Sequence, residues 1–123
     1  MALAPRPEQV AHDRMTRATV PDMAAYLQDL FGQKLTAAIV GINNPKAIGA
    51  YARGQRAPHP EAERRLRDAF HVATLLMTAE CSQTVRSWFM GMNPHLDDRA
   101  PALVIGEQPN RVMQAAKAYL ANG

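Results

Sequence analysis

The chain has 123 residues, 47% of them hydrophobic, and a formal net charge of +3, so it is long enough for one domain or for two small helical units that share a core. Its single cysteine, Cys81, excludes an intrachain disulfide and favours a reducing compartment, and we therefore expect a cytoplasmic protein. The four histidines are scattered and no apolar run approaches ~18 residues, which argues against a metal centre and against a membrane-spanning helix.

The N-terminal part starts with alanine and proline mixed with charged residues, and we expect residues 1–18 to be a flexible arm. A helix is then predicted from about Pro21 to Phe31, because Thr19 can cap its N-terminus and Gly32 can end it. Its apolar residues recur at helical intervals and form the predicted buried stripe: Met23, Leu27, Leu30 and Phe31. A second helix is predicted over Gln33–Val40.

A tight turn connects this second helix to a third. Gly41 supplies the turn, and either Asn43 or Asn44 can cap the third helix. Pro45 fits the first helical position, and Gly54 is well placed to end the helix in a left-handed conformation.

The third helix has one apolar face. Ile48 and Tyr51 repeat at an interval of three and should face the core. The other face is expected to carry basic and small side chains: Lys46, Gly49, Ala50 and Arg53. Two short helices joined by a tight turn are typical of a helix-turn-helix, whose second helix lies in the DNA major groove. We therefore predict that the protein binds double-stranded DNA.

Positive charge is concentrated on the same part of the chain. Seven basic and two acidic residues lie between Lys34 and Arg67, so that segment carries +5. A surface that contacts DNA phosphates needs such an excess. For at least two of Arg64, Arg65 and Arg67, however, we favour a solvated helix face.

Candidate DNA contacts follow from side-chain chemistry. Lys46 and Arg53 can donate to guanine O6 and N7, and are the base-edge candidates. Asn43 and Asn44 can bond adenine, although a helix cap would occupy the side chain, and the small Ala50 allows a duplex to approach closely. The phosphate candidates are Lys34, Thr36, Gln55 and Arg56. The alternative for this whole segment is ordinary helix packing with no DNA contact.

The rest of the chain is also predicted to be helical. Proline starts and glycine stops indicate four helices, over residues 60–79, 83–90, 101–105 and from 109 or 110 to 120. Ser82 can cap the second of these, and Gly91 can end it. We predict an all-α protein, with a helix-turn-helix bundle over residues 19–80 and a small C-terminal helical domain over 81–123.

The C-terminal half carries a series of short motifs. They are Trp88-Phe89, Asn93-Pro94-His95-Leu96, the segment Arg99–Ile105, Val112 and the closing Ala121-Asn122-Gly123. Together with the helix-turn-helix, this order and spacing resembles the Xre/MbcA/ParS antitoxin family over about residues 20–123. Asp97-Asp98 stands where that family often has a glycine.

The resemblance implies an Xre-like DNA-binding domain followed by a toxin-binding domain. Such a protein would neutralise a RES-type, NAD-degrading toxin by direct binding and would repress its own operon. The toxin-binding candidates carried over to this chain are Trp88, Arg111, Lys117, Asn122 and Gly123. From the residues alone, a core role for Trp88 beside Val85 and Phe89 is favoured over a partner contact. We also expect a homodimer, because one helix-turn-helix buries little DNA surface.

Two other functions stay open. The second hypothesis is a stand-alone repressor, bacterial or phage-type, whose C-terminal helices serve dimerisation or a second DNA contact. The third hypothesis is a protein-interaction module that makes no contact with DNA. We expect no enzyme and no cofactor, because there is no glycine-rich phosphate loop and no nucleophile–base pair. Asp97-Asp98 is interpreted as a helix cap rather than a catalytic pair.

Overall fold

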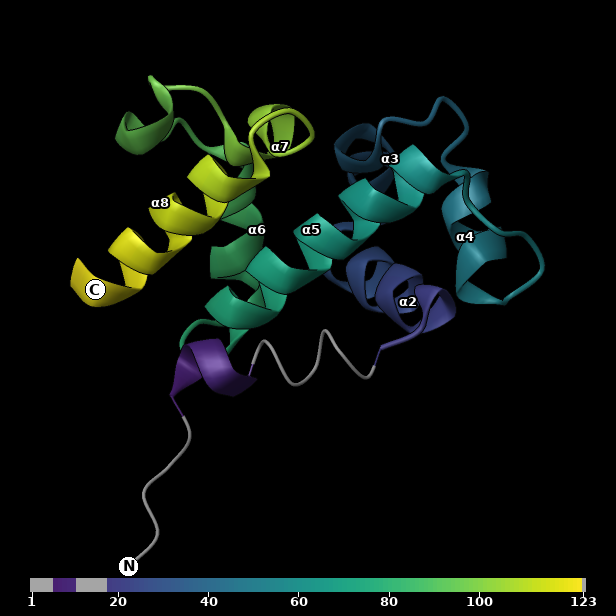
Figure 1. Cartoon of the computed structure of the whole chain (residues 1–123), viewed down its shortest axis with the longest axis horizontal. Helices are drawn as coiled ribbons and strands as arrows, with labels where there is room; N and C mark the ends of the chain where they lie inside the picture. The colour runs from purple at the N-terminus through teal and green to yellow at the C-terminus, as the bar shows by residue number, and fades with distance from the viewer. Residues whose placement is uncertain (1–5, 11–17, 123) are drawn as a thin grey trace, which may run out of the picture.

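The computed structural model describes residues 6–10 and 18–122 and confirms the all-α prediction (Figure 1). No strand forms within these two ranges, where Asn93 and Arg99 make only an isolated antiparallel bridge. The helices are α2 (Val20–Phe31), α3 (Gln33–Val40), α4 (Lys46–Ala52), α5 (Pro60–Met77), α6 (Ser82–Met90), α7 (Pro101–Val104) and α8 (Pro109–Asn122), with the 3-10 turn η1 (Pro94–Leu96) between α6 and α7. Most of the predicted N-terminal arm, residues 1–5 and 11–17, lies outside the described residues.

α2 begins and ends as the sequence predicts. The backbone N–H of Asp22 donates to Thr19 Oγ1 (3.3 Å), and the backbone N–H of Thr19 donates to Asp22 Oδ2 (3.1 Å), which completes a capping box. These hydrogen bonds from Thr19 hold the pKa of Asp22 below its usual value. Gly32 ends the helix with φ +83°, a conformation that favours glycine.

The turn between α3 and α4 confirms one prediction and corrects two others. Gly41 is left-handed (φ +80°), and its N–H donates to Ala37 O, which closes α3. Pro45 precedes α4 instead of being its first residue. Neither asparagine occupies the cap position, which is Pro45 and has no side-chain cap bond; Asn44, one residue earlier, accepts at Oδ1 from the N–H of Lys46 (3.1 Å).

α5 is the central helix of the molecule and packs against α2 and α3 on one side and α6 and α8 on the other (Figure 1). Its buried residues belong to one continuous apolar core that extends through both halves of the chain. The helix starts at Pro60, where His59 Nδ1 accepts from the N–H of Ala62 (3.2 Å). The two predicted units therefore share a core.

Arginines reinforce the contact between the two halves. Arg86 on α6 donates from Nε to Leu30 O at the end of α2 (3.0 Å), and Arg64 donates to Gly106 O (2.8 Å). The guanidinium of Arg65 lies against both Gly41 and Gly106, where an added Cβ would crowd it. These contacts join the turn after α3 to the loop after α7.

Two helix-cap predictions in the C-terminal half are wrong. Ser82 is the first residue of α6, and Cys81 occupies the cap position without a side-chain cap bond. Asp97 and Asp98 do not cap α7, whose N-cap residue is Ala100; Asp97 instead ends η1. Both aspartates instead have positive φ (56° and 62°), which explains why a glycine suits this position. Among the described residues, no helix is long and apolar enough to cross a membrane.

Candidate functional site

α4 presents a narrow outer face at one end of the molecule. Lys46, Ala50 and Arg53 lie four and three residues apart, and therefore share this face. Lys46 and Arg53 are exposed, and Ala50 is partly buried between them. The opposite face packs against α2 and α3 through Ala47, Ile48, Gly49 and Tyr51. We call Lys46, Ala50 and Arg53 the outer face of α4.

Gly49 does not lie on the side of α4 that the sequence predicts for it. The sequence placed Gly49 on the outward side, but it is buried, so that prediction is wrong. A Cβ at Gly49 would lie 2.8 Å from Gln33 Nε2 and 3.4 Å from Gln28 Oε1, and these two side chains are joined by a 2.8 Å hydrogen bond. Gly49 is small because the side chains of α2 and α3 pack closely against α4 at this position, and not because a DNA duplex approaches it.

The stretch of chain that carries the outer face has basic but no acidic residues, although Glu63 of α5 lines a hollow together with Gln55 and Arg56. Residues 30–60 contain four basic and no acidic residues: Lys34, Lys46, Arg53 and Arg56. All four are exposed, and none forms an ion pair within the part of the chain that the structure describes. Asn43 and Gln55 are also exposed at the two ends of α4.

The arginines of α5 differ from these four. Arg64 pairs with Glu61 and Asp68, Arg65 with Glu61, and Arg67 with Glu63. Hydrogen bonding to Arg64 lowers the pKa of the Glu61 carboxyl. Their charge is therefore neutralised locally; Arg65 and Arg67 are only partly exposed, and Arg64 and Arg65 also contact Gly106, so these arginines do not form the freely solvated helix face favoured from the sequence.

The structure overturns the prediction that Thr36 contacts phosphate. Its side chain is 0% exposed, and the hydroxyl lies 2.7 Å from Gly32 O and 3.1 Å from Leu27 O. Thr36 thus bonds the end of α2 and has no surface to offer to DNA. Asn44 is exposed, but its Oδ1 is occupied by the Lys46 N–H, which leaves only its amide N–H₂ for a base.

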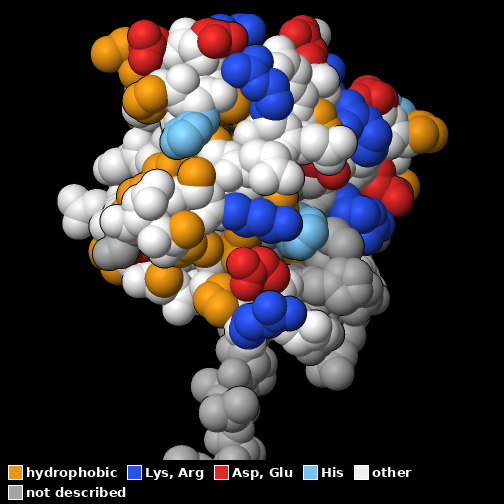
Figure 2. Space-filling view, turned by 60° about the vertical axis from the view of Figure 1, so that its left-hand side comes forward, with side chains coloured by type: hydrophobic (Ala, Val, Ile, Leu, Met, Phe, Trp, Pro, Cys, Tyr) orange, Lys and Arg blue, Asp and Glu red, His pale blue; other side chains and the backbone are white. Residues whose placement is uncertain are grey.

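A groove at the other end of the molecule is lined by some of the residues predicted to bind a toxin. It has a volume of about 280 Å³ and lies among the end of α6, η1 and α8. Its lining residues are Trp88, Met92, Asn93, Pro94, His95, Ala115, Ala118, Tyr119 and Asn122. Figure 2 shows this side of the molecule, with hydrophobic side chains gathered over it. Trp88 and Asn122, both predicted from the resemblance, therefore line one hollow; we call it the C-terminal groove.

The groove is anchored to the core through Trp88, and its edge carries exposed apolar side chains. Trp88 is partly buried and packs edge-on against the buried Phe89, with ring centroids 5.3 Å apart. Met92 is 82% exposed and Met90 is 59% exposed, which is unusual for large apolar residues. Tyr119 donates to Glu80 Oε1 (3.0 Å), and this fixes the end of α8 against the end of α5.

Of the other toxin-binding candidates, Arg111 and Lys117 do not line the C-terminal groove. Arg111 is a tether, since its guanidinium donates to Asp97 Oδ2 (3.3 Å) and to His95 O (3.1 Å), and so holds η1 against α8. Lys117 is exposed and lies roughly 140° around α8 from Asn122, away from the groove. Gly123 lies outside the described residues. The sequence favours gap-filling core for Met92 as a methionine in a Met-rich stretch, and that interpretation is wrong, because Met92 is exposed and lines the groove.

Comparison with protein-family models, with curated proteins and with solved structures finds no match to this chain. The site therefore has to be interpreted from its own geometry.

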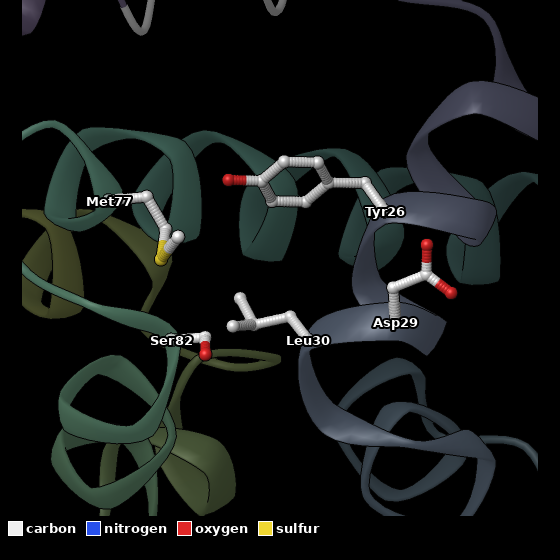
Figure 3. A pocket seen from close by; sticks show the side chains of 5 residues that line it. All are labelled: Tyr26, Asp29, Leu30, Met77 and Ser82. Atoms are coloured by element: carbon white, nitrogen blue, oxygen red, sulfur yellow. The ribbon is translucent and has the colours of Figure 1, made fainter.

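Two other features have less to offer a ligand. A hollow of about 250 Å³ lies between α2, α5 and α6. Its lining side chains are those of Tyr26, Asp29, Leu30, Met77 and Ser82 (Figure 3). Its lining is mostly apolar and lacks the converging polar groups that fix a bound molecule. Cys81 is exposed with Sγ 3.3 Å from Thr84 Oγ1, and hydrogen bonding to Thr84 lowers the pKa of its thiol. Among residues 6–10 and 18–122, no cluster of side chains suited to a metal ion forms.

Proposed function

We propose that the protein is a DNA-binding antitoxin, which binds its operator through the outer face of α4 and a toxin through the C-terminal groove. The observation that carries this proposal is the acid-free outer face of α4, which the buried side of the same helix fixes in place. An exposed cationic helix following a tight turn suits entry into the major groove. As a homodimer, the protein would occupy two operator half-sites and repress its own operon.

The C-terminal groove supports a protein partner. Tryptophan, tyrosine and methionine are enriched at the centres of protein interfaces, and Trp88, Tyr119 and Met92 occur together here. α8, which lines the groove, and α4 lie toward opposite ends of the longest axis (Figure 1). DNA and a protein can therefore be held at the same time. The RES-type identity of the toxin rests on the sequence resemblance.

A pull-down from the native host with reciprocal variants tests both parts of the proposal. Lys46→Ala/Arg53→Ala should lose operator DNA and retain the protein partner. Met92→Glu should lose the partner and retain DNA, because it places a charge on the apolar rim without touching the core. The partner should carry a RES domain, lower cellular NAD when expressed alone, and fail to do so when this protein is co-expressed.

Three other outcomes contradict the proposal. Specific DNA binding without any protein partner would make the chain a stand-alone repressor. A partner bound in the absence of any DNA affinity would make it an interaction module. Loss of both ligands in Met92→Glu, with the chain still folded, would contradict the separation of the two surfaces.

A further inference from the structure

The spacing of the two cations on the outer face of α4 matches a repeat of the DNA duplex. Lys46 and Arg53 are seven residues apart, which is about 10.5 Å along a helix. Three base-pair steps of about 3.4 Å cover nearly the same length. With α4 lying along the major groove, the backbone positions of the two residues would fall about three base-pair steps apart.

The chemistry of this face selects guanine. Lysine and arginine have only donors, and guanine is the base that presents two acceptors, O6 and N7, in the major groove. The outer face of α4 has no carboxylate or amide that would accept from cytosine N4 or adenine N6. Ala50 lies between the two cations and offers only a methyl group, which suits a thymine methyl.

Arg53 is oriented by the residues around it. Its Nε donates to Gln55 Oε1 (3.1 Å), and its Nη1 lies 3.1 Å from the place where a Cβ on Gly49 would be. Gln55 is itself fixed, because Gly54 turns the chain with φ +70° and the backbone N–H of Gln55 donates to Ala50 O (2.9 Å). The guanidinium is thus oriented through Nε, while donors on Nη1 and Nη2 remain for a base.

We propose that α4 reads two guanines three base-pair steps apart, through Lys46 and Arg53, and that Gln55 is a positioning residue for Arg53. This inference rests on the proposed DNA-binding function. It adds a role for Gln55 Oε1, which accepts from Arg53, to the sequence-based prediction that Gln55 contacts phosphate; that contact would use the amide N–H₂ of Gln55. Holding a flexible side chain in its bound geometry lowers the entropy lost on binding.

The test is selection of duplexes from a randomised library by the full-length chain, followed by anisotropy titrations on the selected site. The wild-type chain should enrich two guanines separated by two base pairs, on either strand. Lys46→Ala should lose preference at one guanine and Arg53→Ala at the other, each by roughly tenfold or more. Gln55→Met should weaken discrimination only at the guanine read by Arg53, by roughly three- to tenfold.

Controls separate a positioning role from a structural one. Gln114→Met replaces an exposed glutamine on α8 and should leave discrimination at both guanines unchanged. Affinity for random DNA should be the same for Gln55→Met and wild type, because the phosphate contacts remain. Equal weakening at both guanines in Gln55→Met would overturn its positioning role.

The outcomes also distinguish this inference from the proposed function. Binding of DNA with no base preference, or with a different spacing, would overturn the inference and leave DNA binding intact. Absence of DNA binding in the wild-type chain would overturn both.

Discussion

The two ends of the molecule are built in different ways. The outer face of α4 is cationic, and two residues of this short helix, Lys46 and Ala50, define it together with its C-cap residue, Arg53. The C-terminal groove is apolar, and its lining comes from α6, η1 and α8, which are separated in sequence. One end suits a regular, charged polymer and the other suits a shaped apolar surface. A single small core therefore supports two surfaces of opposite character.

Charge reversal on α4 should have the largest effect. Lys46→Glu/Arg53→Glu puts two carboxylates against the DNA bases and phosphates and should weaken specific binding by about 10³-fold or more. The measurement is fluorescence anisotropy with the selected duplex at fixed salt. Arg99→Glu/Lys117→Glu makes the same change in net charge at exposed sites on the other half of the chain. Equal losses in the two double variants would show that overall charge, and not α4, drives binding.

Met92→Glu should have the next largest effect, and only at the other end. Replacing an apolar contact residue of an interface by a charge costs about 2 kcal/mol, so affinity for the protein partner should fall about 30-fold. Isothermal titration calorimetry with the captured partner measures this change. Leu103→Glu is the matched control, because Leu103 is also an exposed apolar residue but does not line the groove. A comparable loss in the control would contradict the assignment of the groove.

Thr36→Val separates a structural residue from the DNA-binding surface. Loss of the buried hydroxyl should lower the free energy of unfolding by about 1 kcal/mol, as measured by urea denaturation. DNA affinity per folded molecule should stay unchanged, since Thr36 is buried. Thr78→Val, which removes an exposed hydroxyl at the end of α5, should cost less. A loss of DNA affinity with normal stability would restore the phosphate role of Thr36.

The smallest effects are expected for substitutions of Arg111 and Lys117, two basic residues of α8. The resemblance assigned both to toxin binding, but the structure gives them different surroundings. Arg111→Ala frees η1 from α8 and should lower the free energy of unfolding by about 0.5 kcal/mol, since the ion pair is exposed. Lys117→Ala should change neither stability nor partner affinity, because its side chain is exposed and points away from the groove. Thermal unfolding and partner titration give both values. A larger loss of partner affinity in Lys117→Ala than in Met92→Glu would move the interface to the opposite side of α8.

The sequence predicted the local features well. Thr19, Gly32, Gly41 and Gly54 act on the chain within a few residues, and the structure places each as expected. The bounds of α2 and α3 follow from these signals and from the apolar stripe. The burial of Thr36 was also present as a signal, because Thr36 shares a helical face with Ile39 and Val40.

The rest depends on contacts between distant residues. Gly49 is buried by Gln28 and Gln33, and polar residues in two other helices give no periodic signal of that contact. The role of Arg111 as a tether requires the fold of η1. The groove exists only where α6, η1 and α8 meet, so the resemblance implied a C-terminal interaction domain without indicating the shape of its surface.

The most direct test of the account is a titration of the isotopically labelled full-length chain with the selected duplex, followed in amide correlation spectra. The account predicts the largest shift changes over residues 43–56, centred on the outer face of α4, with the Trp88 indole and the Asn122 side chain unchanged. The largest changes at the C-terminal groove, with α4 unaffected, would contradict it.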